Sequence, residues 1–250
     1  MSPLLDAVAA AMTADLAIAA AVAVAAGLMR GYTGFGSGML MAPIFAILYG
    51  PVATVAIIIL LEIVATVQLM PRVLGEIEWR FVTPLGIAAV LFMPIGATIL
   101  GAADPEILTR VMAALVLLFV LVLMTGWRYA GEKKLIPTLG VGAVSGTLMA
   151  ATSVGNPPVL IYMLSSRDTA ATNRANIIAY FAITQGILLL VLFVMGLLTW
   201  LPVAIAVLLT PGYLGAAWLG SRLFRQSNER LYRRVSLVFL LGVAAYGLLR

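Results

Sequence analysis

Six apolar segments, each about twenty residues long, restrict this chain to a membrane environment. They cover approximately residues 51–71, 81–101, 109–129, 172–196, 200–220 and 231–249. A helix needs about twenty apolar residues to cross the hydrocarbon layer of a bilayer. Of the 250 residues, 63% are hydrophobic and 10% are charged, whereas soluble domains carry roughly 25% charged residues. We therefore predict an all-α, polytopic membrane protein.

Two further apolar segments are interrupted by residues that break helices. The first, about 14–49, contains the glycine-rich run 30–38, and the second, about 135–165, contains Thr-Ser-Val-Gly-Asn-Pro-Pro at 152–158. Irregular backbone at membrane depth is tolerated only where protein buries it or where it lines a watery cavity. We therefore predict that each segment is a helix–loop–helix hairpin that returns to the side it entered. The alternative is a single long span with a Gly/Pro kink.

The placement of basic residues favours the two hairpins. If both broken segments return and the other six segments cross, twelve of the fifteen basic residues share one face. The positive-inside rule makes that face cytoplasmic and places both termini outside. If each broken segment crossed once, the arginine-rich loop would instead lie opposite the loops of Arg72 and Lys133. The twelve residues are Arg72, Arg80, Arg128, Lys133, Lys134, Arg167, Arg174, Arg222, Arg225, Arg230, Arg233 and Arg234.

The two halves of the chain share features at a spacing of 119 residues. The matching pairs are Gly27 with Gly146, Gly36 with Gly155, Ser37 with Asn156, Gly96 with Gly215 and Gly101 with Gly220. Each half has a broken hairpin followed by three spans, an odd number of crossings, so the second half is inverted. We predict a first repeat at 1–130 and a second, inverted repeat at 131–250. Many secondary transporters are built this way, with the substrate site between the repeats near the midplane.

The two interruptions are candidate anion-binding sites. Ser37 and Asn156 are suitable N-cap residues, and Pro157 suits a first helical position. Each resumed helix then offers free N–H groups and a positive dipole end to an anion. Glycines allow close approach to the backbone, although Gly27, Gly31, Gly142 and Gly146 fit helix packing better. The candidate substrate-binding residues are Arg30, Thr33, Gly34, Phe35, Gly36, Ser37, Gly38, Thr152, Ser153, Gly155, Asn156 and Pro157.

Two charged residues fall deep within apolar sequence and are candidates for function on that ground. Arg30 precedes the first interruption, where it binds the anion or gates the site, or else reaches the interface by snorkelling. Glu62 lies amid the apolar run 55–70. It pairs with Arg30, carries a coupling proton, or hydrogen-bonds to a neighbouring helix. Gln185 is a coupling or gating candidate, with an interhelical hydrogen bond as the alternative.

The chain contains no cysteine and no histidine. Thiolate and imidazole metal sites and the nucleophiles and bases built on these residues are therefore excluded, and we expect neither a cofactor nor enzymatic activity. The net charge of +5 is interpreted as membrane topology rather than nucleic-acid binding. The cluster at 222–234 is expected to contact anionic lipid. A cleaved signal peptide is not expected, because no basic residue precedes Arg30.

Gly-Phe-Gly-Ser-Gly at 34–38, followed by Pro43, and Ser-Val-Gly-Asn-Pro-Pro at 153–158 make the chain resemble the TauE/SafE sulfite exporter family, also called TSUP. The resemblance covers nearly the whole chain. It implies transport of a small sulfur-containing anion, such as sulfite, thiosulfate, sulfoacetate or another organosulfonate. It also implies a bacterial inner membrane and a site where the two hairpin tips meet. Asn156-Pro157 departs from the family's further glycines, which leaves the particular anion open.

The expected function is secondary transport, by resemblance export, of a small sulfur-containing anion held between two half-helix N-termini. The alternatives are a passive anion channel and a permease for a non-sulfur organic anion. Proton coupling and assembly into a homo-oligomer are left open.

Overall fold

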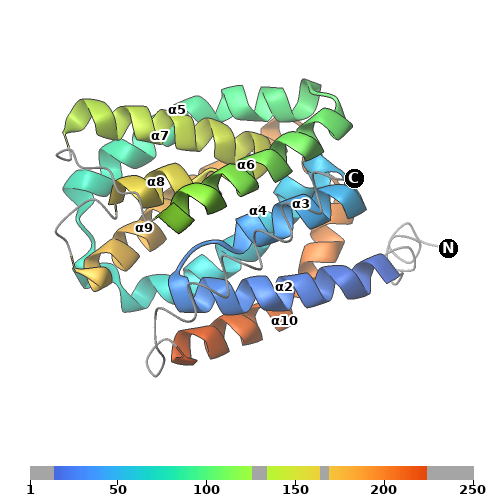
Figure 1. Cartoon of the computed structure of the whole chain (residues 1–250), viewed down its shortest axis with the longest axis horizontal. Helices are drawn as coiled ribbons and strands as arrows, with labels where there is room; N and C mark the ends of the chain where they lie inside the picture. Colours follow the sequence, from blue (N-terminus) through green and yellow to red (C-terminus); the bar gives the residue numbers. More distant parts are fainter. Residues whose placement is uncertain (1–13, 126–133, 164–168, 224–250) are drawn as a thin grey trace.

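The computed structural model describes residues 14–125, 134–163 and 169–223. Within these ranges the chain forms α-helices and two short 3-10 turns, without strands (Figure 1). Seven of the described helices are long and apolar enough to cross a membrane, which confirms the prediction of an all-helical, polytopic protein. The helices are α2 (Ala14–Thr33), α3 (Ser37–Tyr49), α4 (Pro51–Leu69), α5 (Trp79–Ala102), α6 (Pro105–Thr125), α7 (Leu135–Thr152), α8 (Asn156–Met163), α9 (Ala170–Val194) and α10 (Trp200–Leu223).

The predicted uninterrupted spans are observed as α4, α5, α6, α9 and α10, with boundaries within a few residues. The largest difference is α6, predicted at 109–129, which begins at Pro105. The Asp104 side chain accepts hydrogen bonds from the N–H groups of Glu106 and Ile107, at 2.9 and 3.1 Å. This cap, with proline at the first helical position, starts the helix early. The predicted span 231–249 and the basic loop residues at 126–133, 164–168 and 224–234 lie outside the described residues.

Both broken segments consist of two helices joined by a three-residue turn. The turns are residues 34–36 and 153–155, so the interruptions are shorter than the predicted runs 30–38 and 152–158. The first helix of each segment is the longer one, with 20 residues in α2 against 13 in α3, and 18 in α7 against 8 in α8. Figure 1 shows α3 folding back beside α2.

Two helix pairs, α2 with α10 and α5 with α7, lie at opposite edges of the described structure (Figure 1). A Cβ atom added at Gly27 or Gly31 would overlap the carbonyl oxygens of Tyr213 and Ala217. The two contacts follow the same order along both helices, so α2 and α10 run parallel. In the second pair, Gly142 and Gly146 meet Leu85 and Ala89 in the same way. The helix-packing role predicted for these four glycines is confirmed.

The helix boundaries and contacts correspond between the two halves. The starts of α3 and α8, Ser37 and Asn156, are 119 residues apart, and so are the starts of α4 and α9, Pro51 and Ala170. Helix α10 packs on α2 and α4, whereas α5, at the corresponding place in the first half, packs on α7 and α9. Helices α4 and α9 pack on each other. This correspondence agrees with the predicted repeat, and the inversion of the second half stays a prediction.

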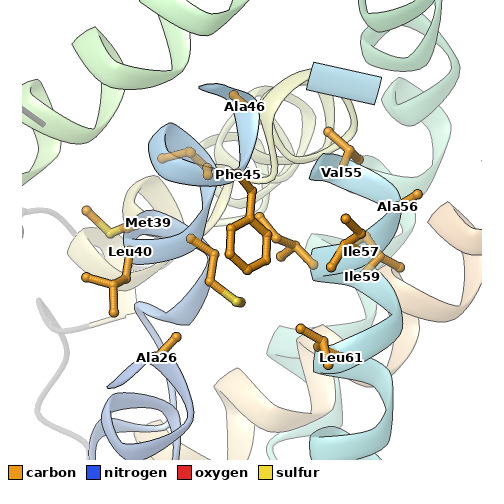
Figure 2. Close-up of a cluster of buried hydrophobic side chains, with 14 of the residues drawn as sticks. Ala26, Met39, Leu40, Phe45, Ala46, Val55, Ala56, Ile57, Ile59 and Leu61 are labelled. Carbon is orange, nitrogen blue, oxygen red and sulfur yellow. The ribbon is translucent and has the colours of Figure 1, made fainter. Parts of the chain in front are cut away.

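A buried apolar cluster fixes α3 against α4 (Figure 2). Phe45 of α3 is fully buried and points toward Ile57 and Ile59 of α4. Within a bilayer such a contact stabilises the helix pair through close van der Waals packing. The contact fixes the distance between the two helices, and with it the position of the α3 N-terminus relative to the polar residues of α4.

Candidate functional site

The turn between α2 and α3 exposes the start of α3 to neighbouring groups. Gly34 and Gly36 have φ angles of 81° and 88°, a left-handed conformation that glycine adopts without steric cost. The N–H of Leu40 donates to the carbonyl of Gly36 at 3.2 Å, which closes the first helical turn. The N–H groups of Ser37, Gly38 and Met39 therefore have no acceptor within the helix.

The two turns approach each other at Gly38 and Ser153. A Cβ atom added at Gly38 would lie only 2.8 Å from the carbonyl oxygen of Ser153 and 3.6 Å from Oε1 of Glu62. Ser153 itself has a φ of 58°, which is uncommon for a residue other than glycine. The start of α3 and the turn at 153–155, which are far apart in the sequence, thus lie so close together that there is no room for a methyl group between them.

A chain of hydrogen bonds links the first turn to α4 and α9. The guanidinium of Arg30 donates through Nη2 to Thr66 Oγ1 at 3.0 Å, and the Thr66 hydroxyl donates to Gln185 Oε1 at 2.9 Å. The Gln185 amide donates to Glu62 Oε2 at 2.6 Å. Ser37 Oγ donates to Glu62 Oε1 at 2.5 Å. All five side chains are at most 3% exposed, so the whole chain is desolvated.

Arg30 is held inside the protein rather than at a membrane interface. It is 0% exposed, so the snorkelling alternative is wrong. Its Nη1 donates to the carbonyl of Gly34 at 3.0 Å, and its guanidinium lies 4.1 Å from the centre of the Phe181 ring. A cation over an aromatic face is favourable, especially when desolvated.

The predicted direct pairing of Arg30 with Glu62 is wrong. The two side chains are connected only by hydrogen bonds through Thr66 and Gln185. Both carboxylate oxygens of Glu62 accept hydrogen bonds from neutral groups. The alternative in which Glu62 hydrogen-bonds to neighbouring helices is confirmed, as is the interhelical role of Gln185. The Arg30 charge therefore has no carboxylate of the described residues in direct contact.

Several buried polar atoms around the two turns have no hydrogen-bond partner among the described residues. They are Arg30 Nε, Ser153 Oγ, Asn156 Oδ1 and the Tyr213 hydroxyl. Tyr213 of α10 lies near Glu62 and Arg30, and its hydroxyl approaches the Ser37 side chain without the geometry of a well-formed hydrogen bond, so it belongs to the same network. Buried polar groups are normally hydrogen-bonded. Three of these four groups can donate a hydrogen bond, whereas Asn156 Oδ1 can only accept one.

The predicted helix caps are wrong at both turns. Gly36 occupies the N-cap position of α3, and the Ser37 hydroxyl donates to Glu62 instead of accepting from the backbone. Asn156 is the first residue of α8 and its amide oxygen has no partner among the described residues. Pro157 and Pro158 lack N–H groups. The start of α8 therefore offers fewer backbone donors than the start of α3, and the two turns are chemically unequal.

The remaining predicted residues support the turns. The Thr152 hydroxyl donates to the Leu148 carbonyl at 2.7 Å and accepts from the Val154 N–H at 3.2 Å. Ser145 donates to the carbonyl of Gly155. Phe35 packs against the apolar cluster built mainly by α5, α8 and α9. Thr33 is the last residue of α2.

Thr66, Phe181 and Tyr213 also contact this network and were not among the residues predicted from the sequence. Thr66 follows Glu62 by four residues, so both face the same side of α4, and this spacing could have identified it. Phe181 and Tyr213 lie in apolar spans where an aromatic residue is normally part of the core. Nothing in the sequence distinguishes their positions.

Comparison with known proteins identifies the family. The search of curated proteins and the search of solved structures gave no match to this chain. The family model described as "Sulfite exporter TauE/SafE" matches residues 19–247, nearly the entire length. The paired turns and the apolar helices described above fall within the matched region. The chain therefore belongs to the TauE/SafE family of sulfite exporters and is a multi-pass membrane transporter.

Proposed function

We propose that this chain is a secondary transporter that binds a small sulfur-containing anion where its two turns meet. One observation carries the proposal: Arg30 Nε, Ser153 Oγ and the Tyr213 hydroxyl are buried donors without acceptors among the described residues. Leaving a buried donor unsatisfied costs about 1–3 kcal/mol. An oxyanion supplies the missing acceptors, and sulfite or a sulfonate presents several oxygens in a compact group.

Arg30 and the start of α3 favour an anion as the ligand of this region, whereas an ionised Glu62 opposes it. Arg30 supplies a full positive charge, and the Glu62 carboxylate reaches it only through Thr66 and Gln185. The N–H groups at the start of α3 add the positive end of a helix dipole. Hydrogen bonds to a charged partner contribute about 1.5–3 kcal/mol each. Two or three such bonds suffice for a dissociation constant in the micromolar to millimolar range.

In this proposal the two halves are inverted repeats, and the anion site lies between them near the midplane. The matching helix boundaries and exchanged contacts of α2, α5, α7 and α10 support the arrangement. We place the transporter in a bacterial inner membrane, as the family implies, with both termini outside, as the distribution of basic residues in the sequence indicates. The family supports export as its direction.

Removing an unpartnered donor separates binding from stability. We expect Tyr213→Phe and Ser153→Ala to leave thermal stability unchanged or higher, because each removes an unsatisfied buried group. Both should weaken anion binding by about 10–150-fold if the lost bond is worth 1.5–3 kcal/mol. The control is Tyr49→Phe. The Tyr49 hydroxyl also lacks a partner among the described residues, but Tyr49 is the last residue of α3, about 18 Å along the helix from Ser37.

The assay is flux and binding in proteoliposomes with sulfite, thiosulfate, sulfoacetate, taurine and sulfate. We expect at least one sulfur anion to bind and to exchange across the membrane, with faster efflux when the same anion is present on the opposite side. Absence of binding by all five anions refutes the substrate class. Flux without such trans-acceleration identifies a channel instead.

A further inference from the structure

We propose that Glu62 takes up one proton when the anion binds, and that Ser37 transmits this exchange between the carboxyl group and the anion. The inference rests on the proposed function and states which ion would drive transport through the same site. It follows from the contacts of Glu62, from the charges around it and from the chemistry of the serine hydroxyl.

Glu62 is 1% exposed, and both of its carboxylate oxygens are in use. Oε1 accepts from Ser37 Oγ at 2.5 Å, and Oε2 accepts from Gln185 Nε2 at 2.6 Å. When Glu62 is ionised, its carboxylate only accepts hydrogen bonds, so both contacts are donated to it. In this state the Ser37 hydroxyl donates its proton in a hydrogen bond to Glu62 and cannot donate it to an anion.

Protonation of Glu62 releases the hydroxyl proton of Ser37. A protonated carboxyl group donates a hydrogen bond, and a serine oxygen can accept it. The Gln185 oxygen already accepts from Thr66, so Ser37 is the partner that can reverse its role. The hydroxyl proton of Ser37 can then point to the anion, which lies beside the start of α3 in the proposed site.

Charge balance makes the two events depend on each other. With Glu62 ionised, its charge and that of Arg30 cancel within a desolvated region. An arriving anion leaves one excess negative charge there, which is costly at low dielectric. A proton from the aqueous side that adds to a Glu62 oxygen restores neutrality. Anion and proton therefore bind together, one of each, and no other reactant is needed.

Arg30 and Tyr213 are the ionisable groups that the network brings to Glu62. Helix α7 carries no ionisable side chain. The other ionisable groups on described helices packed against α4 are Asp15 and Tyr32 on α2, Tyr49 on α3, Arg80 on α5, Glu106 and Arg110 on α6, Arg174 and Tyr180 on α9, and Arg222 on α10. Of these, Tyr180 donates to Ser145, Arg174 donates to Gly31, and Glu106 pairs with Arg110 at the surface.

The test uses methanesulfonate, a monovalent probe without a group that titrates near neutral pH. We expect the wild-type protein to bind it up to about tenfold more tightly for each unit that pH falls between about 8 and 6, the slope for one linked proton. A gradient of the probe should also move protons into proteoliposomes, detected by a trapped pH-sensitive dye. In Glu62→Gln the affinity should not change with pH, whereas Glu106→Gln, a surface carboxylate, should keep the wild-type slope.

Ser37→Ala tests the transmitting role. A purely structural serine would lower affinity equally at every pH. The proposed exchange instead predicts a larger loss at the acidic end of this range, where the hydroxyl is free to donate to the anion, than at the alkaline end. A wild-type affinity that is flat across the range, without proton movement, overturns the coupling and leaves the anion site intact. Absence of binding by methanesulfonate and by every anion of the panel overturns the site itself.

Discussion

The contact between the two turns can be tested with a single methyl group at Gly38. In Gly38→Ala the added Cβ would lie 2.8 Å from the Ser153 carbonyl oxygen, whereas ordinary van der Waals contact begins at 3.4 Å. Neither the carbonyl nor the start of α3 can rotate out of the way, because both are backbone. The two turns must separate by about half an ångström, which also moves Ser37 relative to Glu62.

The expected loss of free energy follows from overpacking at the contact between the two turns. Extra methyl groups in a well-packed interior cost about 1–3 kcal/mol. If the strain is relieved by separating the turns, the bound state loses this energy, because the proposed site supplies donors to the anion from both sides. The dissociation constant then rises by about 5–150-fold. In Gly38→Ala the unfolding temperature measured without the anion should fall less than the unfolding temperature measured with the anion.

The assay is anion binding together with thermal unfolding, with and without the anion, in detergent. Gly186→Ala is the matched control, because Gly186 adjoins Gln185 in α9 but a methyl group added there would meet no described atom within 4 Å. It should bind the anion normally and unfold at the same or a higher temperature. Wild-type affinity in Gly38→Ala would show that the anion does not depend on the approach of the two turns.

Three further substitutions test the buried network and the helix pairs. Arg30→Met should destabilise the protein by about 3–5 kcal/mol, because it leaves the Glu62 charge uncompensated. In a double-mutant cycle, adding Glu62→Gln should recover much of the lost stability, and additive losses of the two substitutions would contradict the linkage. Gly146→Ala should lower the unfolding temperature by overpacking α5 on α7. Gly140→Ala should leave it unchanged, because a methyl group added there would meet no described atom within 4 Å. Equal changes in unfolding temperature would disprove the close packing at Gly146. Ser145→Ala removes the donor to a buried turn carbonyl and should cost about 1–3 kcal/mol, so an unchanged unfolding temperature would count against that role.

The helices and the two interruptions could be predicted from the sequence because they depend on local composition. Apolar length determines which segments can span a bilayer. Gly34 and Gly36 favour a left-handed backbone that ends a helix, and the two prolines at 157–158 fit best in the first turn of a helix, so they mark where a new helix begins. The start of α6 was misplaced because the Asp104 cap was not used as a signal. The close packing of Gly27 and its partners also follows from spacing alone.

The arrangement of the site could not be predicted, because it depends on contacts between distant segments. Ser37 has the chemistry of a cap, but the approach of α4 gives its hydroxyl a stronger acceptor in Glu62. The connection between Arg30 and Glu62 runs through Thr66 and Gln185. Gln185 is brought near only when α9 packs on α4, and no local pattern encodes that contact.

The cross-half pairing of helices has a mechanical consequence. Where Gly31 meets the backbone of Ala217, and Gly146 that of Ala89, a sliding step would force carbonyl groups past one another. We therefore expect helix α2 to move together with α10, and α7 together with α5. In the proposed transport cycle we expect access from either side of the bilayer to require a rigid-body displacement of these two helix pairs relative to α4 and α9, which pack on each other.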